Sequence, residues 1–203
     1  MILLMQKKSF YMKYFIAIYF ILFAGKALCQ VPSQGRSATT ADSFLIAVEK
    51  KNSVFLNKPF PHFSVTTNGI ESSDKRLKGK VVFINFWFAA CAPCIAEMNE
   101  LNRLFKHFSK YKNFEFVSFT FDKLQTIDSV KKKYNIHYNI FPISQDECYR
   151  LNNNNGFPTS IILSSKGLVT FIHATDEVNS AAIKKYFTGK VYPLLLRELN
   201  KDQ

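Results

Sequence analysis

The stretch that most constrains the fold is an apolar run that ends in two closely spaced cysteines. Residues 80–87, KVVFINFW, are almost entirely apolar, as is typical of a strand buried on both faces of a sheet. Cys91 and Cys94 follow directly, and a helix-like pattern runs from about Pro93 to Lys110. The sequence therefore predicts a strand, a turn that carries both thiols, and a helix.

Strands and helices alternate along the rest of the chain. Before the cysteines, FSVTTNGI (63–70) predicts a hairpin that turns at Asn68 and Gly69. After them we expect, in chain order, a strand at 114–121, a helix at 126–134, a strand at 141–144, a short helix around Cys148, strands at 159–164 and 168–174, and a helical tail at 179–200 with breaks at Gly189 and Pro193. This order predicts an α/β domain with a mixed sheet and helices on both faces.

Length and composition fit one folded domain behind a leader. The 203 residues are 47% hydrophobic and include 21 Phe, enough for one good core. We expect the domain to cover 55–203. Residues 30–54 then form a flexible leader, with one short helix at 41–51.

The N-terminus has the pattern of an export signal. Lys7, Lys8 and Lys13 precede an uncharged run at 14–25, and Ala27-Leu28-Cys29 places small residues at the two positions that a signal peptidase recognises. We expect cleavage after Cys29 and a periplasmic mature chain, and Met12 is an alternative start that leaves the signal intact. The run is well short of the about 20 apolar residues of a spanning helix, so a stable membrane anchor is the weaker alternative.

The charge of the chain does not indicate a nucleic-acid partner. The formal net charge is +12, and because residues 1–29 hold four lysines and no acid, residues 30–203 carry 23 basic and 15 acidic side chains, a net +8. These charges are spread along the chain. The only run of three, Lys131–Lys133, fits a solvated helix face better than a nucleic-acid contact.

Three kinds of chemistry are open to the Cys91–Cys94 pair. A zinc site needs about four ligands, and the remaining candidates, Cys148 and four scattered histidines, contain no second close pair. A structural disulfide across two intervening residues closes a very small loop and stabilises little. A thiol at the first turn of a helix faces unpaired N–H groups and the positive end of the helix dipole, which stabilise a thiolate. Redox chemistry is therefore favoured over a structural disulfide and over a metal site.

Residues 78–105, KGKVVFINFWFAACAPCIAEMNELNRLF, resemble the TlpA/ResA-like thiol-disulfide oxidoreductases. NKPFPHFSV (57–65) and NGFPTSIILSSKG (155–167) extend the resemblance, which covers about residues 55–190. It implies a thioredoxin-like fold, with a central mixed sheet flanked by helices and an N-terminal β-hairpin extension. It also implies dithiol–disulfide exchange with other proteins, without a metal or other cofactor.

The resemblance assigns roles to matching residues. Cys91 is the attacking thiol and Cys94 the resolving thiol of a redox disulfide. Pro158 is a cis-proline beside that disulfide, and Phe157 pairs its backbone with a substrate strand. Trp87 packs beneath the active-site turn and is assigned, with Phe157 and Pro158, to the substrate-binding residues.

Glu97 matches the acidic residue one turn after the second cysteine of ResA-like proteins. A carboxylate at this position can accept or relay the proton of Cys94. The alternative interpretation is an ordinary exposed acid on the helix surface, and the sequence leaves both open.

Two positions lack a clear counterpart. Many members of the family have an aromatic residue directly before the first cysteine, where this chain has Ala90, so either the site is more open or Phe88 covers it. Cys148 is left over as a third thiol. A buried core cysteine is favoured there over a third redox partner.

The resemblance also suggests partners. An exported protein of this kind serves as a reductant that is fed by a membrane electron donor and acts on oxidised proteins, with apocytochrome c among the candidates. A thioredoxin-like copper carrier is the main alternative, although its C-x-x-x-C-P motif is one residue longer than the spacing here. A thiol peroxidase is disfavoured because Ile84 and Phe88 occupy the places of its motif proline and threonine.

Overall fold

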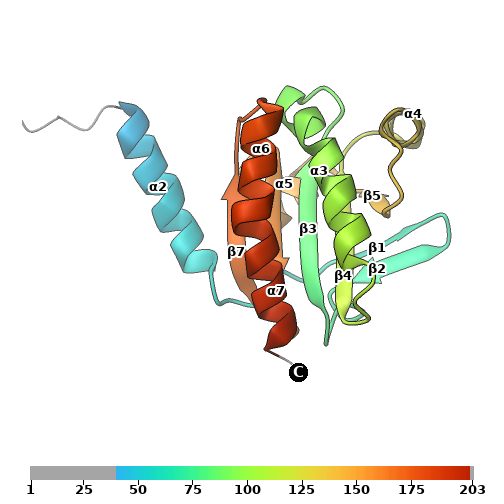
Figure 1. Cartoon of the computed structure of the whole chain (residues 1–203), viewed down its shortest axis with the longest axis horizontal. Coiled ribbons are helices and arrows are strands. Elements are labelled where there is room, and N and C mark those ends of the chain that lie inside the picture. The colour runs from blue at the N-terminus through green and yellow to red at the C-terminus, as the bar shows by residue number, and fades with distance from the viewer. Residues whose placement is uncertain (1–39, 202–203) are drawn as a thin grey trace, which may run out of the picture. The chain divides into compact units, whose positions relative to one another are not determined.

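The computed structural model describes residues 40–201 (Figure 1). The predicted export signal at 1–29, with its cleavage site after Cys29, lies outside the described residues. The predicted leader helix is present and longer than expected, because α2 covers Thr40–Phe55. Residues from Phe44 onward form one unit.

A five-stranded mixed sheet is the centre of this unit. Its strands lie in the order β5-β4-β3-β6-β7, with bounds Ile140–Pro142, Phe114–Thr120, Val81–Trp87, Thr159–Leu163 and Val169–Ala174. β3, β4 and β5 are parallel, whereas β6 is antiparallel to both β3 and β7. The predicted mixed sheet is therefore confirmed.

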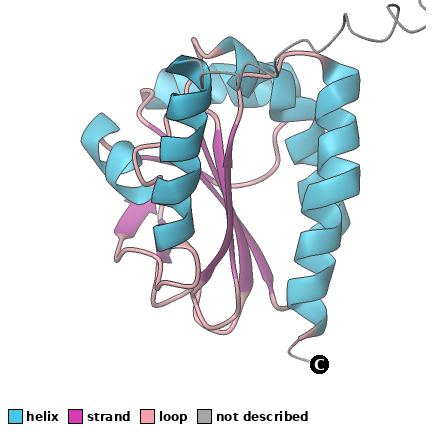
Figure 2. Ribbon diagram, turned by 90° about the vertical axis from the view of Figure 1, so that its left-hand side faces the viewer, coloured by secondary structure: helices cyan, strands magenta, loops and turns pink. Residues whose placement is uncertain are grey.

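The central strand β3 is buried on both faces, as the apolar run predicts, and all seven of its residues are buried. Val81, Phe83 and Trp87 contribute to one core with residues of α3 (Ala92–Phe108), α4 (Leu124–Tyr134), α6 (Ser180–Tyr186) and α7 (Tyr192–Asn200). Val82, Ile84 and Phe86 contribute to a second core with residues of α5 (Gln145–Leu151) and the segment around Phe60. Figure 2 shows helices on both sides of the sheet.

The N-terminal hairpin is also confirmed. β1 (Ser64–Thr67) pairs antiparallel with β2 (Ile70–Ser73). Asn68 and Gly69 between them have φ values of 51° and 77°. Asparagine and glycine tolerate positive φ at both central positions of a tight hairpin turn, which is why this dipeptide predicted the turn.

Some predicted boundaries are wrong for local reasons. β5 ends at Pro142 and not at 144, because the Ser144 side chain accepts a hydrogen bond from Glu147 N–H and so begins α5. The C-terminal tail is not broken at Gly189 or Pro193. A π-helical segment, η1 (Phe187–Val191), joins α6 to α7, and Pro193 lies in the first turn of α7, where a missing N–H costs little.

The described helices were also compared with the dimensions of a bilayer. Within residues 40–201, no helix is both long enough and apolar enough to cross a membrane.

Candidate active site

Cys91 and Cys94 form a disulfide at the junction of β3 and α3. Cys91 is the N-cap residue of α3, and its sulfur accepts a hydrogen bond from Cys94 N–H at 3.2 Å. Pro93 occupies the first turn, where its fixed φ suits a helix start. Both thiols thus lie where the sequence predicted, and the Cys91 sulfur is placed to be stabilised as a thiolate by the N-terminus of α3.

The two sulfurs differ slightly in accessibility. In the disulfide form Cys91 has a relative exposure of 6% and Cys94 of 1%. The more accessible cysteine is therefore the one predicted to attack a substrate, and the less accessible one is the predicted resolving thiol.

The Phe157–Pro158 peptide bond is cis, as the resemblance implies. β6 begins at Thr159, which pairs with Phe86 of β3, so the cis-proline lies at the same end of the sheet as the cysteines. Asn152 anchors the preceding loop. Its side-chain amide donates to the carbonyl of Gly156 at 2.8 Å, and its side-chain oxygen accepts from Asn155 N–H at 3.2 Å.

Glu97 lies one turn after Cys94 on α3 and is not an exposed helix acid. Its relative exposure is 3%, and its Oε2 has no hydrogen-bond partner among the described residues. Burial raises the pKa of Glu97 to about 8, because a low-dielectric environment penalises the charged carboxylate. A group with this pKa can exchange protons near neutral pH.

A cavity of about 230 Å³ adjoins Glu97. It lies between β7 and α6, and its other lining residues are His173, Thr175, Glu177, Ala182, Ile183 and Tyr186. The His173 ring stacks on Tyr186 with centroids 4.4 Å apart, and burial lowers the pKa of His173. No local pattern predicts that His173 and Glu97 line the same cavity, because the two residues lie far apart in the chain.

Trp87 is fully buried in the same core as both cysteines, which is compatible with the predicted packing beneath the active-site turn. Its indole N–H donates to the Ser118 hydroxyl on β4 at 2.9 Å, which satisfies the only polar group of the side chain.

The aromatic residue nearest before Cys91 is Phe88, because Ala90 occupies the position directly before the cysteine. Ala90 is exposed, whereas the half-buried Phe88 stacks on Phe121 at 5.1 Å and meets Phe157 edge-on at 5.4 Å. Tyr149 of α5 also packs against Phe157, at 5.3 Å. Sequence analysis missed Phe121 and Tyr149, since neither belongs to the motifs of the resemblance.

Cys148 belongs to a different environment. It is a free, fully buried thiol in the second core, whereas Cys91 and Cys94 belong to the first. Burial raises the pKa of Cys148 to about 12, with smaller contributions from Glu147 and Asp122. A thiol with this pKa is almost entirely protonated at neutral pH, so the structure favours the core interpretation of Cys148.

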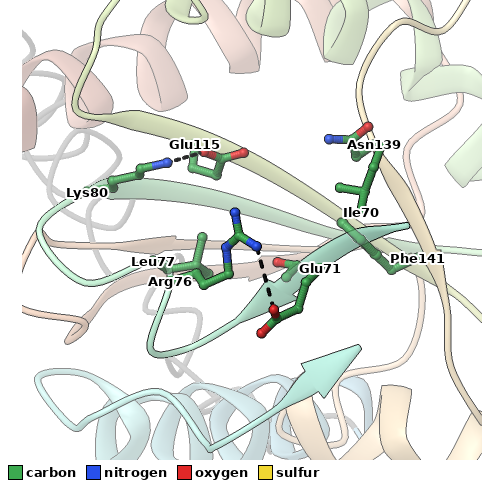
Figure 3. Close-up of a pocket in the computed structure, with 9 residues that line it drawn as sticks. Ile70, Glu71, Arg76, Leu77, Lys80, Glu115, Asn139 and Phe141 are labelled. Carbon is green, nitrogen blue, oxygen red and sulfur yellow. Dashed lines mark hydrogen bonds and ion pairs between the residues drawn. The ribbon is translucent and has the colours of Figure 1, made fainter. Parts of the chain in front are cut away.

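Other places in the described chain are less suited to chemistry. Within residues 40–201, no group of three or more His, Cys, Asp or Glu is arranged to hold a metal ion. The cavity of Figure 3, about 130 Å³, lies near Lys80, which precedes β3, whereas Cys91 follows it. Its charged side chains pair with one another, Lys80 with Glu115 at 2.6 Å and Arg76 with Glu71 at 3.6 Å.

Comparison with known proteins agrees with this geometry. Residues 56–172 match the AhpC/TSA family. The thiol-disulfide oxidoreductase ResA of Bacillus thuringiensis is 33% identical over 123 residues, which cover 59% of this chain and 69% of that protein. ResA of Bacillus subtilis is 28% identical, over 67% of this chain and 76% of its own length.

Solved structures share the fold. A thiol-disulfide oxidoreductase from Bacteroides fragilis has a TM-score of 0.55 at 25% identity and covers 68% of this chain and 99% of its own. A thioredoxin-family thiol:disulfide interchange protein from Chlorobium tepidum has a TM-score of 0.55 at 24% identity, over 70% of this chain and 97% of its own. The predicted thioredoxin-like fold is confirmed.

Proposed function

Because the chain belongs to the AhpC/TSA family and is a thiol-disulfide oxidoreductase of the thioredoxin fold, we propose that it reduces disulfides of exported proteins through Cys91 and Cys94. The observation that carries the proposal is the Cys91–Cys94 disulfide at the N-terminus of α3, at the same end of the sheet as the cis-proline. The paired cysteines supply the two electrons of the reaction, and the described chain needs no other redox group.

The reaction proceeds in two exchanges. In the dithiol form, the Cys91 thiolate attacks one sulfur of a substrate disulfide, which forms a mixed disulfide and releases the other substrate sulfur as a thiolate that takes up a proton. The Cys94 thiolate then attacks the Cys91 sulfur. This step releases the second substrate thiolate and leaves the Cys91–Cys94 disulfide seen in the structure. The substrate gains two electrons and the protein dithiol loses them.

Glu97 supports the second exchange as the proton acceptor for Cys94. Cys94 is almost fully buried, so its proton has little direct access to water. Glu97 follows one turn later on α3, and residues three apart are neighbours on a helix surface. A carboxyl group whose pKa is raised to about 8 is a stronger base than an ordinary carboxylate, so it can accept a thiol proton near neutral pH at smaller cost.

The substrate strand binds at the cis-proline loop. Phe157 offers its backbone to the substrate, as the resemblance implies, and Trp87 forms the floor beneath the active-site turn. The half-buried rings of Phe88 and Phe157 give this part of the surface an apolar character, which suits an extended peptide segment around the substrate cysteine.

The proposed setting is extracytoplasmic. Its support is the signal-like pattern of residues 1–29, with cleavage after Cys29. In an oxidising compartment a reductant must itself be reduced again, and we assign that task to a membrane electron donor. Oxidised thiol proteins, with apocytochrome c as one candidate, are the proposed substrates.

Trapping the mixed disulfide tests the function directly. A Cys94→Ala variant keeps the attacking thiol and lacks the resolving one, so substrates should accumulate as covalent complexes in cells that produce it. Reducing agent should release them for identification, and a Cys91→Ala variant is the matched control. If the two variants trap the same proteins to the same extent, the proposed role of Cys91 is wrong.

The two rival functions have separate tests. Titration of the reduced protein with copper and zinc should give no tight stoichiometric binding that depends on Cys91 and Cys94; such binding would favour a metal carrier. Peroxide consumption should stay far below disulfide reduction, because the positions seven and three residues before Cys91 are the apolar Ile84 and Phe88. Rapid peroxide turnover would favour a peroxidase.

A further inference from the structure

Two residues that follow β4 contact the turn that leads to Cys91. The Asp122 carboxylate accepts a hydrogen bond from Ala89 N–H, with 2.7 Å between Oδ2 and the nitrogen. The neighbouring Phe121 ring stacks on Phe88 at 5.1 Å. Phe121 and Asp122 thus contact Phe88 and Ala89, three and two positions before the attacking cysteine.

The Asp122 carboxylate is itself held in place. The hydroxyl of Thr120, a fully buried residue at the end of β4, donates to Asp122 Oδ2 at 3.0 Å and accepts from Asp122 N–H at 3.2 Å. Oδ2 therefore accepts two hydrogen bonds, one from Thr120 at the end of β4 and one from Ala89 in the active-site turn. Hydrogen bonds to an ionised carboxylate are among the stronger ones in proteins.

The turn transmits this contact to Cys91. Cys91 N–H donates to the carbonyl of Phe88 at 3.1 Å, which closes the turn around Ala89. Cys91 is then the N-cap residue of α3, with its sulfur near Cys94 N–H. A continuous series of hydrogen bonds and peptide units therefore leads from Thr120 through Asp122 and Ala89 to Cys91.

We propose that Asp122 is a positioning residue for disulfide exchange, because its carboxylate holds the Phe88–Cys91 turn at the N-terminus of α3. In the oxidised protein the covalent bond to Cys94 also holds Cys91. In the dithiol and mixed-disulfide forms that bond is absent, so the turn is held by its hydrogen bonds, among them the one from Ala89 N–H to Asp122. The proposal rests on the proposed role of Cys91 as the attacking thiol.

Asp122 has two opposing effects on Cys91. By holding the turn it keeps the sulfur near the N–H groups that stabilise a thiolate. Its negative charge, in contrast, disfavours a nearby thiolate. The hydrogen bond reaches the turn directly, whereas the carboxylate is partly exposed and its charge is screened by solvent. The positioning effect should therefore be the larger one.

Two substitutions separate these effects. Asp122→Asn keeps an oxygen that accepts from Ala89 N–H and removes the charge, whereas Asp122→Ala removes both. Asp128→Ala, at an exposed position on α4, is the matched control for loss of one acid. Because Asp122→Ala can disturb folding, Thr120→Val is a second probe: it keeps the buried volume and removes the hydroxyl that orients the carboxylate.

The readout is the alkylation rate of Cys91 in the reduced full chain as a function of pH, with the labelled cysteine located by mass spectrometry. Asp122→Ala should slow labelling at neutral pH by about two- to tenfold, because the loss of the hydrogen bond is partly offset by the loss of a negative charge near the thiolate. Thr120→Val should change the rate in the same direction. Asp122→Asn and Asp128→Ala should stay close to the parent protein.

Each outcome decides between the proposals. If Asp122→Ala and Thr120→Val leave the profile of Cys91 unchanged, Asp122 does not position it. If Asp122→Asn and Asp122→Ala both raise the labelling rate to the same extent, the charge acts and not the position, which also overturns the inference. If the parent protein is labelled faster at Cys94 than at Cys91, the proposed roles of the cysteines fail instead.

Discussion

Glu97 and Glu100 lie one turn apart on α3, and both are buried, yet they have different surroundings. Glu100 pairs with Arg103 on the same helix. Oε2 of Glu97 has no partner among the described residues, and burial raises the pKa of Glu97 to about 8. Buried acids that serve the fold are usually paired, because an unpaired one costs free energy. The unpartnered Glu97 thus fits the proposed proton transfer, whereas the paired Glu100 fits a role in stability.

The largest effect should come from the cysteines that begin this helix. Cys91→Ala should abolish disulfide reduction, whereas Cys94→Ala should form mixed disulfides and stop there. In the reduced parent protein, Cys91 should be alkylated much faster than Cys94, because it is the N-cap residue and the more accessible of the two. Equal labelling rates would remove the distinction between an attacking and a resolving thiol.

The two glutamates should differ strongly in activity. Glu97→Gln keeps the shape of the side chain and removes the base, so it should slow the exchange step that depends on Cys94 by about a hundredfold or more. The inflection near pH 8 in the rate of that step should disappear. The thiol pKa values should also be lower in the variant, because Glu97 is ionised above about pH 8 in the parent and its negative charge then disfavours a thiolate. Stopped-flow rates against pH, together with thiolate absorbance, measure both effects.

Glu100→Gln is the control on the same helix. It removes the pair with Arg103 and should leave the pH profile of exchange intact. If the profiles of the two variants and the parent superimpose, Glu97 is a core residue with no part in proton transfer.

Glu97→Gln and Glu100→Gln should have opposite effects on the free energy of unfolding. The folded protein keeps the Glu97 proton up to about pH 8, whereas an unfolded chain releases it above about pH 4.5. Unfolding in this window releases a proton, so the stability of the parent should fall as the pH rises through it. At pH 7, Glu97→Gln should raise the free energy of unfolding by about 1–3 kcal/mol and make it less dependent on pH.

Thermal unfolding of the oxidised proteins measures this effect, at about 2–4 °C per kcal/mol for a chain of this size. Glu100→Gln should not gain stability, because it loses a paired charge. A Glu97→Gln variant no more stable than the parent at pH 7 would show that the folded protein bears no cost for this carboxyl group.

The sequence was sufficient for the features that depend on local pattern. The buried strand β3, the hairpin turn at Asn68 and Gly69, and the position of Cys91 at the start of α3 all follow from apolar spacing, turn chemistry or motif. Features that depend on contacts between distant segments could not be predicted. The contact between Asp122 and Ala89 and the cavity that His173 shares with Glu97 join residues 33 or more positions apart, and no local pattern indicates them.

The role of Glu97 also could not be predicted from the sequence alone. Its place in the motif left two interpretations open, a proton carrier and an exposed acid. Glu97 is buried where α3 packs against α6, which lies more than 80 residues later in the chain, and this burial excludes the exposed acid. The predicted breaks in the C-terminal tail were wrong for a related reason. Gly189 and Pro193 are poor helix residues in general, but the π-helical turn accommodates the first and the first turn of α7 the second.

The smallest effect should be at Cys148, the thiol of the second core. It is fully buried on the opposite face of the sheet from Cys91, and its pKa is raised to about 12, so it should exchange with neither the active site nor a substrate. Cys148→Ala removes only a buried sulfur and should lower the free energy of unfolding by about 1 kcal/mol. Denaturant unfolding measures that cost, and disulfide reductase activity under native conditions should equal that of the parent. A loss of activity greater than the loss of folded protein, or a disulfide between Cys148 and either active-site cysteine, would instead make Cys148 a third redox partner and place reactive thiols on both faces of the sheet.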